Sequence, residues 1–161
     1  MINKFVDIRT FKNLLNNFHL LKMIKVLDMK FMRYVNLFNK ITGLRCNHCF
    51  EYNNSIIFAV PRKFIVKAIG TNNKNLEKLN RLIGKRIKII AIPNGKEDIE
   101  GFVTIITKPV RFRGIEIRND EVIINAGSQS KASLIGRNKV RLSEMENILG
   151  QYFGIKKVLI R

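Results

Sequence analysis

Apolar residues recur along this chain in two rhythms, which together predict an α+β protein. Some segments carry apolar residues every three or four positions, the spacing of one helix face. Between them lie short runs rich in Ile and Val, which are typical of strands. The predicted helices lie at 31–38, 76–83, 99–106 and 142–149. The clearest predicted strands lie at 55–60, 86–92, 121–126 and 155–160.

The order of these segments is repeated. Residues 67–74 and 133–140 each centre on an Ile-Gly pair, and the two pairs are 66 positions apart. The apolar runs at 55–60 and 121–126 have the same offset. Agreement in element order and in glycine position indicates a duplicated unit of helix, strand, strand, helix, Gly-containing loop, helix and strand.

Turn chemistry supports the repeat. Asn53 and Asn54 precede the first apolar run, and Asn119 and Asp120 precede the second. Asn and Asp tolerate the left-handed backbone that a two-residue hairpin turn needs, so each pair predicts a β-hairpin.

The repeat divides the chain into three parts. Residues 1–28 form an N-terminal extension with helical spacing, followed by a first module at 29–93 and a second at 94–161. The connection around Pro93, Asn94 and Gly95 is short, which favours modules held in a nearly fixed relation.

Charge narrows the possible partners. The chain has 30 Lys and Arg against 12 Asp and Glu, a formal net charge of +18. Such an excess favours binding to polyanions, either nucleic acid or an anionic membrane surface. No run of about 18 uncharged apolar residues is present, and the N-terminus lacks the pattern of a secretory signal. We therefore expect a cytoplasmic location.

The duplicated unit resembles the type II KH domain, in which a helix and a strand precede a strand–helix–loop–helix–strand core. In that family the loop between the core helices reads Gly-x-x-Gly after an Ile, and Ile69-Gly70 and Ile135-Gly136 match its first half. Two such modules on a short chain are similar to the archaeal-type NusA-like transcription termination/antitermination factors. Landmarks at 38–43, 82–86 and 153–155 add to the resemblance, which covers residues 29–161.

The resemblance implies an α+β fold of two tandem type II KH modules, each with a three-stranded sheet and helices packed on one face. It also implies that the protein binds single-stranded RNA and that the Gly-containing loops hold the RNA backbone. The expected RNA-binding residues are Lys67, Ile69, Gly70, Thr71, Asn72, Asn73 and Lys74 in the first module. In the second they are Lys131, Ile135, Gly136, Arg137, Asn138, Lys139 and Arg141.

Both loops depart from the family pattern at the second glycine. Asn73 replaces it in the first module and Lys139 in the second. Asn is the better substitute where a positive φ is required, so the first loop is the stronger candidate for RNA binding. The second loop is expected to bind weakly, to use a shifted register, or to belong to a packing module.

Basic residues outside the loops form two further groups. Lys85, Arg86 and Lys88 open the last strand of the first module, and Arg111, Arg113 and Arg118 are expected along the first strand of the second. If the modules pack side by side, these residues are expected to join into one positive track.

The segment Cys46-Asn47-His48-Cys49 suggests a metal motif, but it is one ligand short of a structural zinc site, and the only other His is His19. If the segment is a strand, the two Cys side chains point to opposite faces. We therefore expect no metal site, and His48 is expected at the surface or in the groove.

No residues suited to catalysis stand together in the sequence, so we expect no enzymatic activity, no cofactor and no small-molecule substrate.

Residues 1–28 keep helical spacing at Phe11, Leu14, Leu15, Phe18, Leu21 and Ile24. Three interpretations remain open: a helix packed on the first module, a basic amphipathic membrane or partner helix, or an extension that the fold does not need.

The leading functional hypothesis is RNA binding in transcription elongation, termination or antitermination, with RNA polymerase as a partner implied by the resemblance. The first alternative is a factor for ribosome assembly or rRNA processing. A second, of another class, is a membrane-surface or interaction protein led by the N-terminal helix, although a membrane partner is not favoured.

Overall fold

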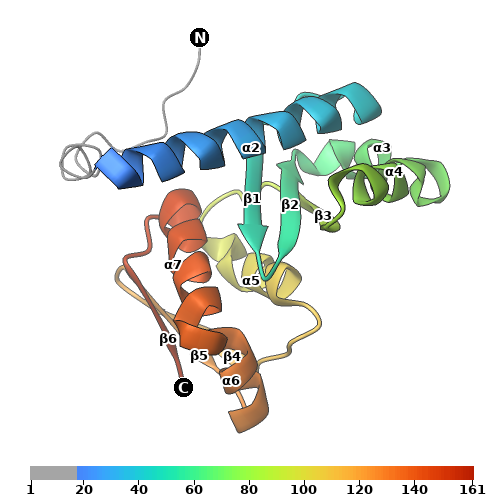
Figure 1. Cartoon of the computed structure of the whole chain (residues 1–161). Coiled ribbons are helices and arrows are strands. Elements are labelled where there is room, and N and C mark those ends of the chain that lie inside the picture. Colours follow the sequence, from blue (N-terminus) through green and yellow to red (C-terminus); the bar gives the residue numbers. More distant parts are fainter. Residues whose placement is uncertain (1–17) are drawn as a thin grey trace.

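The structure is a computed structural model that describes the backbone from residue 18 to 161 and the side chains from residue 29. It is an α+β protein with two three-stranded sheets and helices, as the sequence predicts (Figure 1). The first module contains α2 (Phe18–Thr42), β1 (His48–Tyr52), β2 (Ser55–Val60), α3 (Ile65–Ile69), α4 (Lys74–Ile83) and β3 (Arg86–Ala91). The second contains α5 (Ile99–Thr107), β4 (Gly114–Arg118), β5 (Glu121–Asn125), α6 (Ser128–Ile135), α7 (Val140–Phe153) and β6 (Lys157–Ile160).

Short 3-10 turns complete the modules. They lie at Arg62–Phe64, Thr71–Asn73, Lys96–Asp98 and Arg137–Lys139.

Both sheets have the same topology. In sheet A (β1, β2, β3) β1 is antiparallel to β2, and β3 is parallel to β2; sheet B (β4, β5, β6) repeats this arrangement. The predicted hairpin turns are present: Asn53 and Asn54 have φ of 48° and 57°, and Asn119 has φ of 54°. The duplication read from the sequence is therefore a duplication of fold.

One face of sheet A is covered by the helices of its own module. Phe38 on α2 stacks on Phe58 of β2 with ring centroids 4.5 Å apart, and both rings are fully buried. Leu79 of α4 and Ala68 of α3 complete this core. The alternation of apolar residues along β2 sends Ile56, Phe58 and Val60 to this side.

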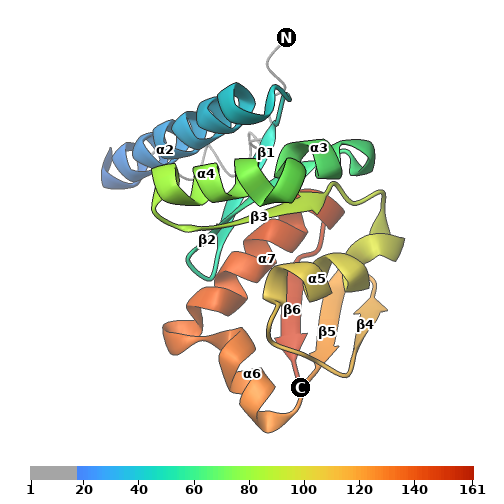
Figure 2. The same cartoon turned by 90° about the vertical axis from the view of Figure 1, so that its right-hand side faces the viewer.

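The opposite face of sheet A is covered by the second module, which was not expected. Phe50 and Ile57 belong to one continuous buried cluster with Phe102 of α5 and Met145 and Phe153 of α7. Helix α5 consequently lies between the two sheets (Figure 2). The expectation of helices on one face holds for sheet B, but sheet A is packed on both faces because all six residues of β2 are apolar or small and buried.

The second face of sheet B carries several polar side chains around Ile123, which is buried. There the carboxylate of Glu116 accepts hydrogen bonds from Arg118 (2.8 Å) and Asn125 (3.1 Å). Strand β4 begins at Gly114, so Arg111 and Arg113 lie in the loop before the strand and not along it as expected.

Helix α2 starts at Phe18 and runs without interruption past residue 28, where the extension was expected to end. Phe11, Leu14 and Leu15 lie outside the described residues. Within residues 18–161, no helix is long and apolar enough to cross a membrane.

Candidate nucleic-acid interface

The first loop, Gly70–Asn73, connects α3 to α4 through an unusual backbone. Gly70 has φ 79° and ψ 162°, a conformation that glycine adopts readily and other residues rarely do. Asn72 and Asn73 follow with φ of 52° and 60°. Lys67, Thr71, Asn72, Asn73 and Lys74 are all exposed, whereas Ile69 and Gly70 are partly buried.

The second loop, Gly136–Lys139, repeats this conformation closely. Gly136 has φ 71° and ψ 170°, and Asn138 and Lys139 have φ of 52° and 59°. Lys139 therefore takes the left-handed conformation despite its long side chain. Lys131, Arg137, Asn138 and Lys139 are exposed, whereas Ile135, Gly136 and Arg141 are partly buried.

Each loop is braced by the second residue of the helix that follows it. Asn75 Nδ2 donates to the carbonyl of Lys67 (3.2 Å), and Arg141 Nη1 donates to the carbonyl of Ser133 (2.7 Å). A Cβ on Gly70 would lie 2.9 Å from Asn75 Cγ, and one on Gly136 would lie 2.9 Å from Arg141 Cγ. Both glycines are thus required by close packing as well as by φ. Arg141, predicted to contact RNA, already uses part of its guanidinium to hold the loop.

The helices that follow the two loops begin without a side-chain cap. Neither Asn73 nor Lys139, the residues that precede α4 and α7, makes a side-chain capping hydrogen bond. The first N–H groups of a helix lack intrahelical partners and carry partial positive charge, so such ends attract phosphate. Each loop therefore places exposed cations beside the N-terminal end of a helix.

The two loops are not neighbours. Figures 1 and 2 both place α3 and α4 at the top of the molecule and α6 at the bottom. The loops consequently form two separate sites.

A shallow, open cavity of about 340 Å³ lies beside α6. It is lined by Pro109, Val110 and Arg111 from the segment before β4, and by Gln129, Ser130 and Ser133 of α6. Its polar lining and the exposed Arg111 suit a charged, extended ligand better than a small apolar one.

Several of the basic residues predicted to form a track have other partners. Lys85 forms an ion pair with Glu51, and Arg118 pairs with Glu116. Lys88 Nζ donates to the carbonyls of Ile106 (2.8 Å) and Lys108 (3.0 Å) at the C-terminal end of α5. Lys88 thus connects the two modules, and sequence reasoning missed this role.

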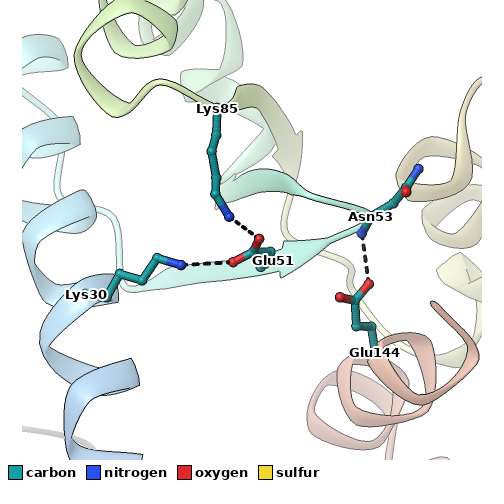
Figure 3. Close-up of polar contacts among 5 residues, drawn as sticks. All are labelled: Lys30, Glu51, Asn53, Lys85 and Glu144. Atoms are coloured by element: carbon teal, nitrogen blue, oxygen red, sulfur yellow. Dashed lines mark hydrogen bonds and ion pairs between the residues drawn. The ribbon is translucent and has the colours of Figure 1, made fainter. Parts of the chain in front are cut away.

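Glu51 and Asn53 also connect neighbouring elements (Figure 3). Glu51 on β1 accepts from Lys30 of α2 (3.3 Å) and from Lys85. Burial alone would raise the pKa of Glu51, but the hydrogen bond from Lys85 and the charges of Lys30 and Lys85 lower it overall. The backbone N–H of Asn53 donates to Glu144 of α7 (2.9 Å), so the β1–β2 hairpin of the first module rests on the helix that follows the second loop.

Tyr52 lies at the same contact. Burial raises the pKa of Tyr52 to about 12, the charge of Arg141 opposes the rise and that of Glu144 adds to it. The first module therefore contacts the helical turn that braces the second loop.

The Cys46–Cys49 segment differs from its expected geometry. The strand begins at His48, and both thiols pack toward the helix-covered face of sheet A, so the expectation of opposite faces is wrong. Burial raises the pKa of both Cys46 and Cys49. Among the side chains from residue 29 onward, no three His, Cys, Asp or Glu residues lie close enough together to hold a metal ion.

His48 is partly exposed. Its ring lies 5.6 Å from that of Tyr152, between the modules, and burial lowers its pKa.

The fold and the two loops define a strongly basic protein built from two copies of one α+β unit, each with an exposed Gly-containing loop. Comparison with known proteins agrees with this class. The chain is 25% identical over 130 residues to the probable transcription termination protein NusA of Methanococcus vannielii, covering 78% of this chain and 73% of that protein. The predicted resemblance to the archaeal NusA-like factors is thereby confirmed.

A solved structure is also similar. The crystal structure of APE1850 matches with a TM-score of 0.53 and 27% sequence identity, covering 81% of this chain and 96% of that chain. No family model matches the chain.

Proposed function

We propose that this protein binds single-stranded RNA through two tandem type II KH modules and acts as a NusA-like factor in transcription elongation or termination. The observation that carries the proposal is the pair of loops with the same left-handed backbone, each exposed and each followed by a helix without a side-chain cap, on a chain of net charge +18.

The order and direction of the strands support the KH assignment. Each module has an antiparallel hairpin followed by two helices and a strand parallel to the second hairpin strand, the arrangement that the resemblance implies. KH modules clamp about four nucleotides with the loop and read unstacked bases in an adjacent groove. The exposed cations around both loops fit contacts to the phosphates of such a segment.

The two loops are more alike in their fitness for RNA binding than their sequences suggest. Lys139 holds the same φ as Asn73, and it adds a cation where the first loop has a neutral amide. We therefore propose that both loops bind RNA, with the second depending more on charge.

The role in transcription rests on the named relative, which is a probable termination protein. RNA polymerase is accordingly the proposed protein partner. Co-purification of the polymerase with the tagged protein would support this role. Crosslinks confined to ribosomal RNA precursor would favour a ribosome assembly factor instead.

The direct test of RNA binding measures the affinity for single-stranded RNA, single-stranded DNA and duplex RNA over a range of salt concentrations. We expect preference for single-stranded RNA, and a loss of about tenfold or more when Asn72 and Asn73 are both changed to Asp, because two negative charges would face the phosphates. The matched control changes Asn94 and Asn119 to Asp, which alters the charge equally on exposed turns elsewhere. Equal binding of duplex, or equal effects of the two double variants, would reject the KH groove.

A further inference from the structure

We propose that the junction between the two modules holds a second kind of RNA contact, a phosphate-binding site formed by Arg86, Lys108 and Arg111 and organised by Lys88. This junction site rests on the proposed RNA-binding function and adds a surface to which neither Gly-containing loop contributes.

Arg86, Lys88 and Lys108 lie close together where the second module packs against sheet A. Figure 2 shows α5 beside this sheet. Arg86 and Lys88 are two positions apart on β3, so both point to the face of sheet A that the second module covers. Lys88 Nζ is 3.0 Å from the carbonyl oxygen of Lys108, the residue that follows α5. Burial lowers the pKa of Lys88, and the positive charges of Arg86 and Lys108 lower it further, as expected for cations at close range.

The positive charge at the junction is not balanced by nearby acids. Among the side chains from residue 29 onward, the ion pairs of the structure engage Lys30, Lys85, Lys96, Arg118 and Lys156, and none involves Arg86, Lys88, Lys108 or Arg111. Like charges held together repel, and binding of a polyanion relieves that repulsion. Arg86, Lys108 and Arg111 are exposed and so available to a ligand.

Lys88 makes the site suitable for an anion. The C-terminal end of a helix carries partial negative charge from its unpaired carbonyls, which would repel a phosphate next to Lys108. Lys88 donates to the carbonyls of Ile106 and Lys108 and so neutralises this end of α5. Lys88 is therefore a positioning residue, while the three exposed cations are the proposed phosphate contacts.

The junction site is continuous with the cavity beside α6. Lys108 and Arg111 lie on the same short segment before β4, and Arg111 lines that cavity together with Ser130 and Ser133. Helix α6 leads directly into the second loop, so an RNA strand held there can continue over Arg111 and Lys108 toward Arg86. This continuity favours a nucleic-acid strand over an acidic protein segment as the ligand.

The test compares two triple variants of the full chain that have the same net charge. The junction variant changes Arg86, Lys108 and Arg111 to Gln. The control variant also introduces three Gln residues, at the exposed cations Arg33, Lys157 and Arg161 on other surfaces. Each lowers the formal charge from +18 by three. The probe is a single-stranded oligouridylate of about 12 nucleotides, within the range of known single-strand sites.

We expect the junction variant to bind about tenfold more weakly than the control and its salt dependence to be less steep by about 2, since each phosphate contact to a single strand contributes about 0.7 to the slope. Equal affinity and equal slope of the two variants, with the wild type still binding, would overturn the junction site alone. Failure of the wild type to bind any single-stranded RNA would reject the proposed function together with this site.

Two further readouts make the outcome unambiguous. Ultraviolet crosslinking of the same RNA to the wild-type protein is expected to give adducts in the segment 108–113, and adducts confined to the two loops would contradict the proposal. An oligoglutamate peptide that binds through the same three residues while RNA affinity is unchanged would assign the surface to an acidic protein segment, which would also overturn it.

Discussion

Sheet A and sheet B have the same strand order and direction, yet their second faces meet opposite environments. The second face of sheet A packs against α5 and α7, whereas that of sheet B carries exposed polar side chains around a buried centre at Ile123. Position by position, with an offset of 66 residues, Phe50 is replaced by Glu116, Tyr52 by Arg118 and Ala59 by Asn125. These three substitutions place polar side chains on the face of sheet B that corresponds to a buried face of sheet A, without changing the topology.

This difference teaches how a duplicated unit becomes one body. The first module has an apolar outer face that would be unstable in water on its own, and the second module covers it with its own helices. The second module ends the stack with a polar outer face, as terminal units of repeat proteins do. The modules therefore share one core, and the fixed relation expected from the short connection has a physical cause.

The largest expected effect comes from removing an aromatic ring between the modules. Phe50 contacts Phe102 (6.2 Å between centroids) and Tyr152 (5.6 Å), so Phe50→Ala should lower the free energy of unfolding by about 3–5 kcal/mol. The counterpart Glu116→Ala on sheet B should leave the urea midpoint almost unchanged, because Glu116 is exposed. Similar losses for the two variants would remove the distinction between the faces.

A smaller effect is expected from the polar contact at the junction. Lys88→Met keeps the aliphatic stem but loses the hydrogen bonds to the end of α5, and should cost about 2 kcal/mol in urea unfolding. Lys157→Met on the exposed face of sheet B is the control and should change stability little. If Lys88→Met is neutral, the ammonium does not hold the modules together.

The third prediction concerns pH and the first module alone. Glu51→Gln should cost about 1 kcal/mol near neutral pH, because the carboxylate pairs with Lys30 and Lys85 at a partly exposed site. The pKa of Glu51 in the folded protein is below its ordinary value of 4.5, so its contribution is complete above that pH and is lost as the pH falls through the lowered pKa.

The equivalent position on sheet B is Ile117, which has no charge to titrate. Stability curves of the wild type and Glu51→Gln should therefore converge in acid. Curves that stay parallel down to low pH would show that the ion pairs contribute nothing.

The smallest effect distinguishes the loops. Lys139→Gly should stabilise the protein by about 0.5 kcal/mol, since glycine avoids the cost of a left-handed side chain but loses more entropy on folding. Asn73→Gly should gain less, because Asn tolerates this conformation better. Thermal unfolding of the two variants shows which substitution stabilises the protein more. A destabilised Lys139→Gly would mean that the lysine side chain makes a favourable contact.

Much of the fold could be predicted from local sequence. The helical spacing, the Ile- and Val-rich runs and the Asn turns predicted the element order, and the structure confirms it. These features are local or repeat at a fixed offset, so a single sequence is enough to detect them.

The packing between modules could not be predicted in the same way, although a signal was present. The run from Ser55 to Val60 has small or apolar residues at every position, which indicates a strand buried on both faces, whereas the run at 121–125 begins and ends with polar residues. The role of Lys88 had no such signal, because a lysine on a strand reads as a solvated charge until its partner helix is placed.

The site was predicted only in part. The glycines and the exposed cations are where the sequence placed them, and their role in RNA binding stays a prediction. The bracing by Arg141 was not foreseen, because its counterpart Asn75 has different chemistry and the shared contact depends on the folded loop. Conversely, Lys85 and Arg118 were expected to be free cations, but each forms an ion pair. Lys85 pairs with Glu51, which is distant in sequence, and Arg118 pairs with the nearby Glu116.

The most direct test of the central claim, that the two modules form one body with a shared core, is amide hydrogen exchange of the full chain in the wild type and in Phe50→Ala. Exchange at Ile57 of β2 and Ile123 of β5 reports opening of sheet A and sheet B separately. If the core is shared, Phe50→Ala lowers the free energy of opening by the same amount, about 3 kcal/mol or more, at both amides. Loss of protection at Ile57 with Ile123 unchanged would contradict the claim and show two modules that unfold independently.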